Sequence, residues 1–353
     1  MVKIVGVMSG TSLDGLDLCY TEFDFKDDKW EYKIIIAEDE EYPLEIKGKL
    51  ANAQSMSAQS YALFNSDYGL YLGRRIKNFI DRHTLEPDYI ASHGHTIFHQ
   101  PSKRFTAQIG SGAGIAAETG VDTICDFRTM DVALGGQGAP LVPVGDRNLF
   151  PEFAYCLNMG GFSNISYNFG EDRIAYDISP VNYVLNHYTR KIGLDYDKDG
   201  EIARSGKIDR GLLTDLNNLE FYTLEGPKSL GREWVEEVVI PLIDSYGLSI
   251  EDRLATFCEH VAMQISRHIK SDRVLVTGGG ALNRYLIERM SANAPQCEYF
   301  VPDNLTVNFK EALIFAFLGA LYVSDIPNCL KSVTGAKYNN IGGALYKGIR
   351  RSF

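Results

Sequence analysis

The chain opens with three strand-like segments, and the same arrangement begins again near its middle. Residues 2–8, 18–25 and 32–37 read as strands separated by glycine-rich or charged turns. From Phe153 the segments AYCLNM, NISYNF and RIAYDI repeat this order, with glycines between the first two. Helical and strand patterns alternate after each set. The repetition predicts an α/β fold of two similar domains, with the cleft between them as the natural ligand site.

Helical periodicity is clearest in residues 60–80, 252–269 and 309–323. We place the domain boundary between residues 145 and 146, which gives domains 1–145 and 146–353. The last long helix, 309–323, is expected to return to the first domain. We expect no run of the sequence to be long enough to span a membrane.

The charge balance limits the partners of this chain. It carries 46 acidic residues against 35 lysines and arginines, for a net charge of -11. Such a surface repels nucleic-acid backbones and anionic membranes, so neither is expected as a partner. A small anionic ligand is still compatible, because backbone amides and a metal ion can hold it locally. The oligomeric state is open, with a homodimer as one expectation.

The cysteines and the amino terminus both indicate a cytoplasmic protein. The six cysteines are scattered, show no paired spacing and lie mostly in apolar segments, as reduced core residues do. The first residues turn polar and glycine-rich too soon for a signal peptide.

Glycine-rich turns follow the first strand of each repeat. Backbone N–H groups and hydroxyls of such a turn can surround phosphate oxygens, and an aspartate beside it can hold magnesium through water. The residues assigned to this role in the first repeat are Gly10, Thr11, Ser12, Asp14, Gly15 and Asp17. On its own this turn is equally a hairpin loop, because it lacks the Walker pattern. The second repeat, however, supplies Gly160, Gly161 and Asn164 at the same place. Two phosphate loops facing one cleft are typical of actin-like kinases.

A third glycine-rich turn follows a buried strand and opens a helix. Gly278, Gly279 and Gly280 allow a flat ring or a ribose to approach the backbone closely. A tight strand-to-helix turn would need the same glycines. With two phosphate loops upstream, we interpret this turn as the nucleoside site and ATP as the nucleotide.

Seven segments together resemble the anhydro-N-acetylmuramic acid kinase family, in the family's order. They are MSGTSLDGLD, SHGHTIFHQP, FRTMDVALGGQGAPLVP, NMGGFSNIS, DGEIARSG, GGGALN and KEALIFAFL. The resemblance runs from about residue 6 to about residue 343, and the third segment is the most specific. It implies two actin-like, ribonuclease H-like domains that use ATP and Mg²⁺ in peptidoglycan recycling. The implied reaction opens a 1,6-anhydro sugar with water and phosphorylates its O6, giving N-acetylmuramic acid 6-phosphate.

The resemblance also implies two catalytic carboxylates, Asp177 and Glu311. The family writes its aspartate in a D-T-G-P motif followed by an asparagine, and here Ile178 and Ser179 replace the threonine and glycine. This removes a hydroxyl donor and restricts the backbone beside the reacting groups. A related kinase of another sugar is therefore one alternative. A nucleotide-binding actin-like protein without catalysis is another, although the retained Asp177 argues against it.

The sugar is expected to contact the first domain. Arg128 offers a cation for a carboxylate and Asp131 an acceptor for hydroxyls. His95, Thr96 and Gln137 are weaker candidates for substrate binding. Any of these residues can instead be structural.

Two metal-like patterns are rejected, so no resident metal site is predicted. His93, His95 and His99 alternate as zinc ligands on a strand would, but lack a fourth ligand cluster. Asp195, Asp197 and Asp199 match the first half of a calcium loop, but Gly206 stands where the bidentate glutamate belongs. We expect this acidic loop to orient substrate or to cap the helix that follows.

Overall fold

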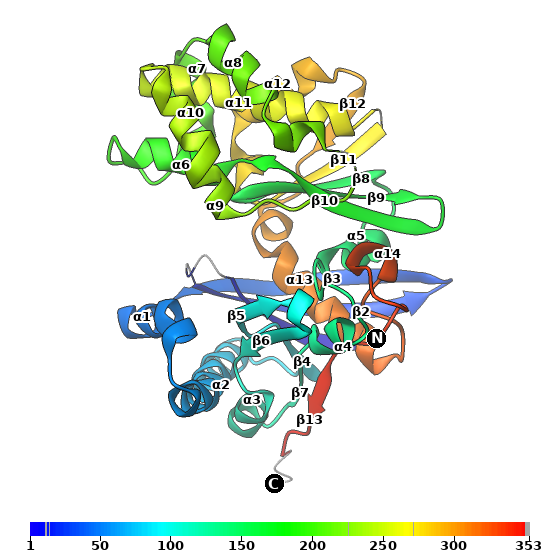
Figure 1. The fold of residues 1–353 in the computed structure, drawn as a ribbon. Coiled ribbons are helices and arrows are strands. Elements are labelled where there is room, and N and C mark those ends of the chain that lie inside the picture. The colour runs from blue at the N-terminus through cyan, green and yellow to red at the C-terminus, as the bar shows by residue number, and fades with distance from the viewer. Residues whose placement is uncertain (11–12, 14, 225, 271, 350–353) are drawn as a thin grey trace. The chain divides into compact units, whose positions relative to one another are not determined.

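The computed structural model describes the chain except for residues 11–12, 14, 225, 271 and 350–353. It contains two compact units (Figure 1). Unit 1 comprises Met1–Leu149 and Phe309–Phe353, and unit 2 comprises Phe150–Asn308. Relative to the division drawn from the sequence, residues 146–149 and the whole segment 309–353 lie in unit 1.

Unit 1 is built on a six-stranded sheet with the order β13-β7-β4-β1-β2-β3. Its strands are β1 (Val2–Ser9), β2 (Gly15–Lys26), β3 (Lys29–Glu41), β4 (Tyr89–Ser92), β7 (Asp122–Cys125) and β13 (Ala344–Tyr346). The first three strands are antiparallel neighbours, whereas β4 and β7 run parallel to β1 and to each other. A separate hairpin pairs β5 (His95–Gln100) with β6 (Phe105–Ile109). The strands predicted at residues 2–8, 18–25 and 32–37 correspond to β1, β2 and β3.

Helices cover both faces of this sheet. The α-helices are α1 (Leu44–Asn52), α2 (Ala58–Arg82), α3 (Gly112–Thr119), α4 (Thr129–Ala133), α5 (Val142–Leu149), α13 (Asn304–Val323) and α14 (Lys331–Thr334). The buried stripe of α2, which includes Tyr68 and Leu72, belongs to the same hydrophobic cluster as Leu16 and Leu18 of β2. On the opposite face α13 comes so close that a Cβ on Gly6 would lie 2.0 Å from the Ala312 carbonyl oxygen. Glycine at this position therefore permits the contact.

Helix α13 is long and apolar enough to cross a membrane, judged by length and composition. The expectation that no run reaches that length is therefore wrong. In the structure, however, 78% of its apolar window is buried. Such burial is what the core helix of a globular unit shows.

Unit 2 repeats the strand order of unit 1. Its five-stranded sheet has the order β10-β9-β8-β11-β12, which corresponds to β3-β2-β1-β4-β7. The strands are β8 (Tyr155–Met159), β9 (Phe162–Phe169), β10 (Asp172–Pro180), β11 (Asp272–Thr277) and β12 (Cys297–Phe300). Three antiparallel strands again precede two parallel ones. The predicted repetition is confirmed, although β12 was not recognised in the sequence.

The helices of unit 2 gather on one face of its sheet (Figure 1). They are α6 (Asn182–Arg190), α7 (Glu201–Ser205), α8 (Arg210–Asn217), α9 (Arg232–Trp234), α10 (Ile240–Ser245), α11 (Ile250–His268) and α12 (Arg284–Asn293). Leu254, Phe257 and Val261 of α11 form the predicted stripe and are fully buried against the sheet. The β8–β9 turn lies beside the start of α6, where the candidate site is found.

Candidate active site

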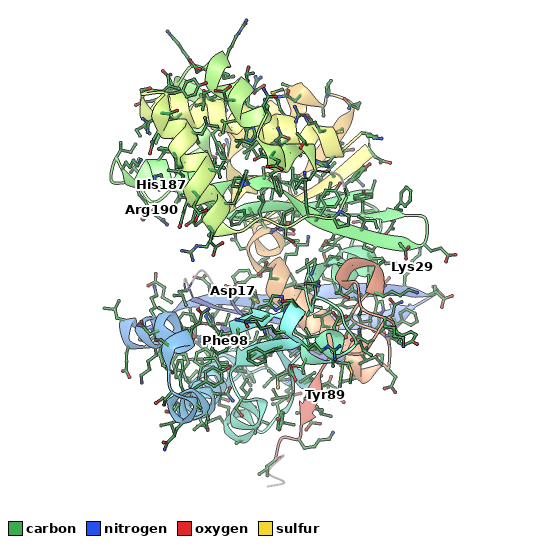
Figure 2. All side chains as sticks on the ribbon, viewed as in Figure 1. Asp17, Lys29, Tyr89, Phe98, His187 and Arg190 are labelled. Atoms are coloured by element: carbon green, nitrogen blue, oxygen red, sulfur yellow. The ribbon has the colours of Figure 1, made fainter. Side chains whose placement is uncertain are left out.

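The first glycine-rich turn lies between β1 and β2 of unit 1. Thr11, Ser12 and Asp14 fall outside the described residues. Gly15 begins β2, and a Cβ there would lie 2.6 Å from the Glu40 carbonyl oxygen, so this glycine serves strand packing. Asp17 follows on β2, half-buried and paired with Met8 of β1 (Figure 2). Its carboxylate is the described group near this turn that suits a hydrated magnesium ion.

The second glycine-rich turn lies between β8 and β9 and is tied to α6. The Gly161 carbonyl accepts hydrogen bonds from the N–H groups of Val181 (2.8 Å) and Tyr183 (3.1 Å), and the Gly160 carbonyl accepts one from Asn182 (3.2 Å). A Cβ built on Gly160 or Gly161 would meet its nearest atoms only at 3.8 and 3.9 Å. The packing of the chain therefore does not require glycine here, whereas close approach by a ligand would.

Three polar side chains form a row across the sheet beside this turn. Asn164 of β9 pairs with Asn158 of β8 on one side and with Asp177 of β10 on the other. Directly paired residues share a face of the sheet, so the predicted cofactor residue Asn164 neighbours the predicted catalytic Asp177. Asn158 joins the row and was not assigned a role from the sequence. Only the register of β8 against β9 shows that Asn158 lies in this row.

Asp177 is held by the main chain of a segment that includes Leu230, 53 residues further along the sequence. Its N–H donates to the Lys228 carbonyl at 2.9 Å, and its Oδ2 accepts the Leu230 N–H at 2.9 Å. Desolvation raises the pKa of Asp177, and the Leu230 hydrogen bond partly offsets this rise. A carboxylate with a raised pKa and a fixed orientation is suited to accept a proton.

The two departures from the family motif lie beside Asp177, but both are accommodated within unit 2. Ile178 is fully buried and belongs to the hydrophobic core. Ser179 is also buried, and its hydroxyl shares a hydrogen bond with Ser163 at 3.1 Å. Both side chains therefore point into unit 2, and neither lies exposed beside the Asp177 carboxylate.

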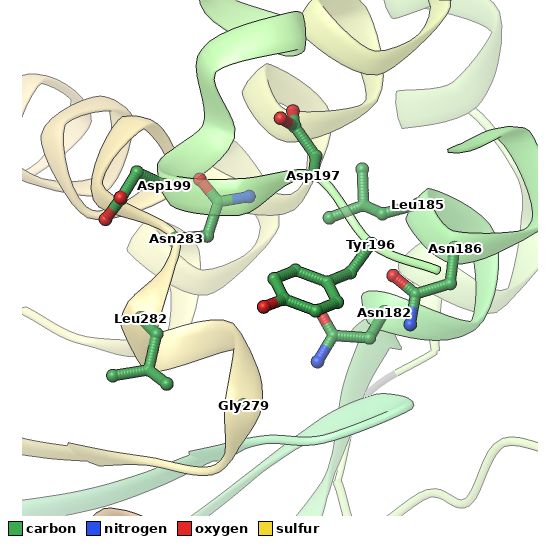
Figure 3. Close-up of a pocket in the computed structure, with 9 residues that line it drawn as sticks. All are labelled: Asn182, Leu185, Asn186, Tyr196, Asp197, Asp199, Gly279, Leu282 and Asn283. Atoms are coloured by element: carbon green, nitrogen blue, oxygen red, sulfur yellow. The ribbon is translucent and has the colours of Figure 1, made fainter. Parts of the chain in front are cut away.

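The third glycine-rich turn borders a cavity of about 290 Å³ within unit 2 (Figure 3). The cavity is lined by Asn182, Leu185, Asn186, Tyr196, Asp197, Asp199, Gly279, Leu282 and Asn283. An adjoining cavity of about 650 Å³ shares Tyr196, Asp199 and Leu282 with it. Together they have the size and the mixed apolar and amide lining of a small-molecule site.

The three glycines of this turn have different roles. Gly278 has φ of +80°, and a Cβ there would lie 2.7 Å from Asn158 Oδ1. A Cβ on Gly280 would lie 2.8 Å from Met159, so both glycines pack the turn against β8. Of the three, Gly279 alone lines the cavity, opposite the ring of Tyr196, a residue that is 61% exposed. Of the three residues predicted to bind the nucleoside, the structure places Gly279 at the cavity.

The acidic loop on this cavity stabilises the helix that follows it. Both Asp197 carboxylate oxygens accept main-chain N–H groups at the start of α7, from Ile202 and Ala203, at 2.9 Å each. Asp199 forms an ion pair with Arg284 at 3.2 Å. Among the residues that the structure describes, no group of three or more His, Cys, Asp and Glu side chains is arranged to hold a metal ion. Asp197 therefore caps the start of α7, which is one of the two roles expected of this loop.

Arg128 and Glu311 influence each other electrostatically in unit 1. Arg128 Nε and Nη2 contact His93 Nε2 at 3.2 and 2.9 Å, and Nη1 donates to the Gly138 carbonyl at 2.6 Å. Desolvation lowers the pKa of Arg128 to about 10, against the opposing effect of Glu311. Desolvation likewise raises the pKa of Glu311, while Lys310 and Arg128 lower it. The Glu311 side chain keeps solvent exposure, which limits the size of this shift.

Asp131 is placed differently from what a sugar-binding residue needs. It is completely buried, and its Oδ2 accepts the Gly138 N–H at 2.7 Å. Its Oδ1 accepts from the Thr334 hydroxyl (2.8 Å) and the Asn340 amide (2.9 Å). Asp131 thus ties the loop around Gly138 to the C-terminal segment, and we propose that it positions this loop instead of contacting the sugar.

The remaining sugar-binding candidates differ in accessibility. His95 is buried, and its Nδ1 shares a hydrogen bond with the Ser9 hydroxyl at 2.9 Å. Desolvation lowers the pKa of His95 to about 4, so the ring is neutral near pH 7. Thr96 is half-buried, whereas Gln137 is exposed and fixed through its N–H, which donates to the Thr334 carbonyl at 2.7 Å. Thr96 and Gln137 thus keep the solvent-accessible surface that contact with a ligand would need.

The topology and the site together define a class of protein. Each unit has the 3-2-1-4-5 strand order of a ribonuclease H-like domain, and each carries a glycine-rich turn between its first two strands. This duplicated arrangement is that of the actin-like fold, which serves ATPases and sugar kinases.

Comparison with known proteins narrows the class to one family. Residues 2–348 match the profile of the anhydro-N-acetylmuramic acid kinase family. The anhydro-N-acetylmuramic acid kinase of Pasteurella multocida is 36% identical, with 97% of this chain and 96% of that protein covered. That of Shewanella loihica is 33% identical, with 98% of both chains covered. The chain belongs to the anhydro-N-acetylmuramic acid kinase family.

Among solved structures, an activator of 2-hydroxyisocaproyl-CoA dehydratase from Clostridium difficile with bound ADPNP aligns over 92% of this chain and 97% of that one, at 15% identity and a TM-score of 0.45.

Proposed function

We propose that this chain is an ATP-dependent sugar kinase that acts on 1,6-anhydro-N-acetylmuramic acid. It opens the anhydro ring with water and phosphorylates O6, and the product is N-acetylmuramic acid 6-phosphate. Family membership over nearly the whole chain supports the substrate. The observation that carries the chemistry is Asp177, a carboxylate with a raised pKa, held by main-chain hydrogen bonds in the same row as Asn164.

The nucleotide is assigned to unit 2. The base and ribose of ATP would occupy the cavity beside Gly279, and the Tyr196 ring offers an exposed flat surface to the base. The phosphates would extend toward Gly160 and Gly161, where there is space beside the backbone. Magnesium would neutralise phosphate charge during transfer, and Asp17 is the described carboxylate proposed to reach it through water.

The chemistry requires one proton acceptor and one leaving oxygen. Asp177 takes a proton from the water molecule that attacks the anomeric carbon. The bond from that carbon to O6 breaks, and O6 takes the γ-phosphoryl group, so that ADP leaves. Glu311 is the proposed second carboxylate; desolvation raises its pKa, and the charges of Lys310 and Arg128 oppose that rise. Phosphorylation of O6 thus replaces the general acid of an ordinary glycosidase.

Fewer residues are proposed to contact the sugar than the sequence suggested. Arg128, Thr96 and Gln137 remain proposed contacts, with Arg128 facing a carboxylate of the substrate. Because Ile178 points into the core and Ser179 bonds to Ser163, the altered motif no longer favours a different sugar. We further propose that the protein works in the cytoplasm, consistent with its six free cysteines.

A coupled assay of ADP release tests this function. With ATP and Mg²⁺, 1,6-anhydro-N-acetylmuramic acid should release ADP, whereas ordinary hexosamines should release little. In water labelled with heavy oxygen, the label should appear at the anomeric carbon and not in the phosphate. Ring opening without nucleotide, or label in the phosphate, would contradict the coupled reaction.

A further inference from the structure

A short segment beside the edge strand β10 makes two main-chain contacts with Asp177. This segment, residues 228–232, is called the strap. Its Lys228 carbonyl accepts the Asp177 N–H, and its Leu230 N–H donates to Asp177 Oδ2, both at 2.9 Å. One contact fixes the backbone of Asp177 and the other fixes its carboxylate.

The strap is anchored on both sides of these contacts. On one side the Lys228 ammonium donates to the carbonyls of Phe221 (3.0 Å) and Leu224 (3.1 Å) and lies 4.5 Å from the centre of the Phe221 ring. On the other side Arg232 Nε donates to the Tyr183 hydroxyl at 3.4 Å, and its guanidinium lies over the Tyr183 ring.

The second anchor leads to the turn assigned to phosphate. The Tyr183 N–H donates to the Gly161 carbonyl at 3.1 Å, and its ring stacks on Phe162 with centroids 5.8 Å apart. The strap therefore contacts Asp177 and, through Tyr183, the β8–β9 turn. A displacement of the strap would move the carboxylate without removing it.

We propose that the strap is a positioning element whose Leu230 N–H holds Asp177 Oδ2 and leaves Oδ1 to accept the proton of the attacking water. This inference rests on the proposed function, in which Asp177 is the base. A carboxylate fixed through one oxygen presents the other in one direction, which is the condition for efficient proton transfer. The Leu230 side chain has no part in this role.

The charges around Asp177 predict how its pKa changes when the hydrogen bond from the Leu230 N–H is lost. Its neighbour on β9, Asn164, is neutral, and the Lys228 ammonium is engaged by two carbonyls. The pKa of Asp177 is raised by desolvation and lowered by the Leu230 N–H. Removing that N–H should therefore raise the pKa of Asp177 further, and the acidic limb of the pH–rate profile should move to higher pH.

Leu230→Pro removes the N–H because proline has no amide hydrogen, and Leu230→Ala is the matched control that keeps it. Leu230→Pro should lower kcat about tenfold or more, the scale for a hydrogen bond to a charged group, with KM for ATP unchanged. The carboxyl ¹³C titration of Asp177 in nucleotide-free protein, assigned with Asp177→Asn, should shift upward in Leu230→Pro. It should keep the parent's midpoint in Leu230→Ala.

Tyr183→Phe provides a milder variant without a charge change, should Leu230→Pro fail to fold by circular dichroism. It removes the hydroxyl that anchors Arg232 and should shift the titration in the same direction by a smaller amount. A parental titration midpoint in folded Leu230→Pro, or in Tyr183→Phe if the proline variant does not fold, would overturn the proposal. A parent protein without kinase activity would instead refute the proposed function, and the titration would still decide whether the strap controls Asp177.

Discussion

Asn in place of Asp131 tests whether this residue binds sugar or holds a loop. An amide oxygen can replace only one of the two carboxylate oxygens, so the amide nitrogen must face either the Gly138 N–H or the donors of Thr334 and Asn340. One or two buried donors then lose their acceptor, at about 1–3 kcal/mol each. Because the site is completely buried, we expect Asp131→Asn to destabilise unit 1 by about 2–4 kcal/mol.

The chain's two tryptophans make this effect measurable in unit 1 alone. Trp30 lies in unit 1, with its ring 5.2 Å from that of Phe317, and Trp234 lies in unit 2. In a Trp234→Phe background, fluorescence during urea unfolding reports Trp30. The urea midpoint of Asp131→Asn should then be about 1 M lower than that of the parent, because the free-energy loss is divided by an m-value of about 1–3 kcal/mol/M.

Thr334→Val serves as the control for this experiment. It removes one of the three donors and leaves the Asp131 carboxylate in place, so it should cost about 1 kcal/mol. The double variant should lose less than the sum of the two single losses, because both act on the same contact. KM for the sugar should remain at the parental value in Asp131→Asn. An unchanged unfolding midpoint together with a tenfold higher KM would refute the loop-holding role and restore Asp131 as a sugar ligand.

Three further predictions follow from the site. Asp177→Asn should keep ATP binding by calorimetry while turnover falls by about 10² or more, and parental turnover would move the base elsewhere. Gly279→Val should weaken ATP binding about tenfold with little change in thermal stability. Gly278→Val should instead destabilise unit 2, because of these two glycines only Gly278 has a positive φ and neighbouring backbone at contact distance. Equal losses of stability in the two variants would contradict these separate roles. The unfolding free energy should fall as pH drops from about 6.5 to about 4, because the unfolded chain protonates His95 while the folded chain keeps it neutral. His95→Gln should reduce this pH dependence. If urea titrations gave the same slope of unfolding free energy against pH for His95→Gln and the parent, this prediction would be wrong.

The sequence predicted the parts of this fold that depend on local pattern. Alternating residues and glycine-rich turns located the first three strands of both units, because side-chain period and turn chemistry act over a few residues. The three-residue β13 has too little length to show a period. The glycines of the third turn were grouped as one ligand motif, although only their separate neighbours distinguish Gly279 from Gly278 and Gly280.

The partners of the functional side chains were beyond the reach of such patterns. Asp131 bonds to Thr334 and Asn340, which lie 203 and 209 residues away, and Leu230 is 53 residues from Asp177. Main-chain donors such as the Leu230 N–H leave no trace in residue identity. Burial of His95 and Asp131 likewise depends on tertiary packing, so their residue types alone suggested ligand binding.

The return of residues 309–353 to unit 1 determines the order in which the chain can fold during synthesis. Unit 2 is continuous in sequence and has all its residues once Asn308 has left the ribosome. Unit 1 then still lacks most of α13, the edge strand β13 and the Thr334 and Asn340 donors. The part of the protein that is made first is thus completed last, and premature termination after residue 308 would spare unit 2 while leaving the opening 149 residues without a finished core.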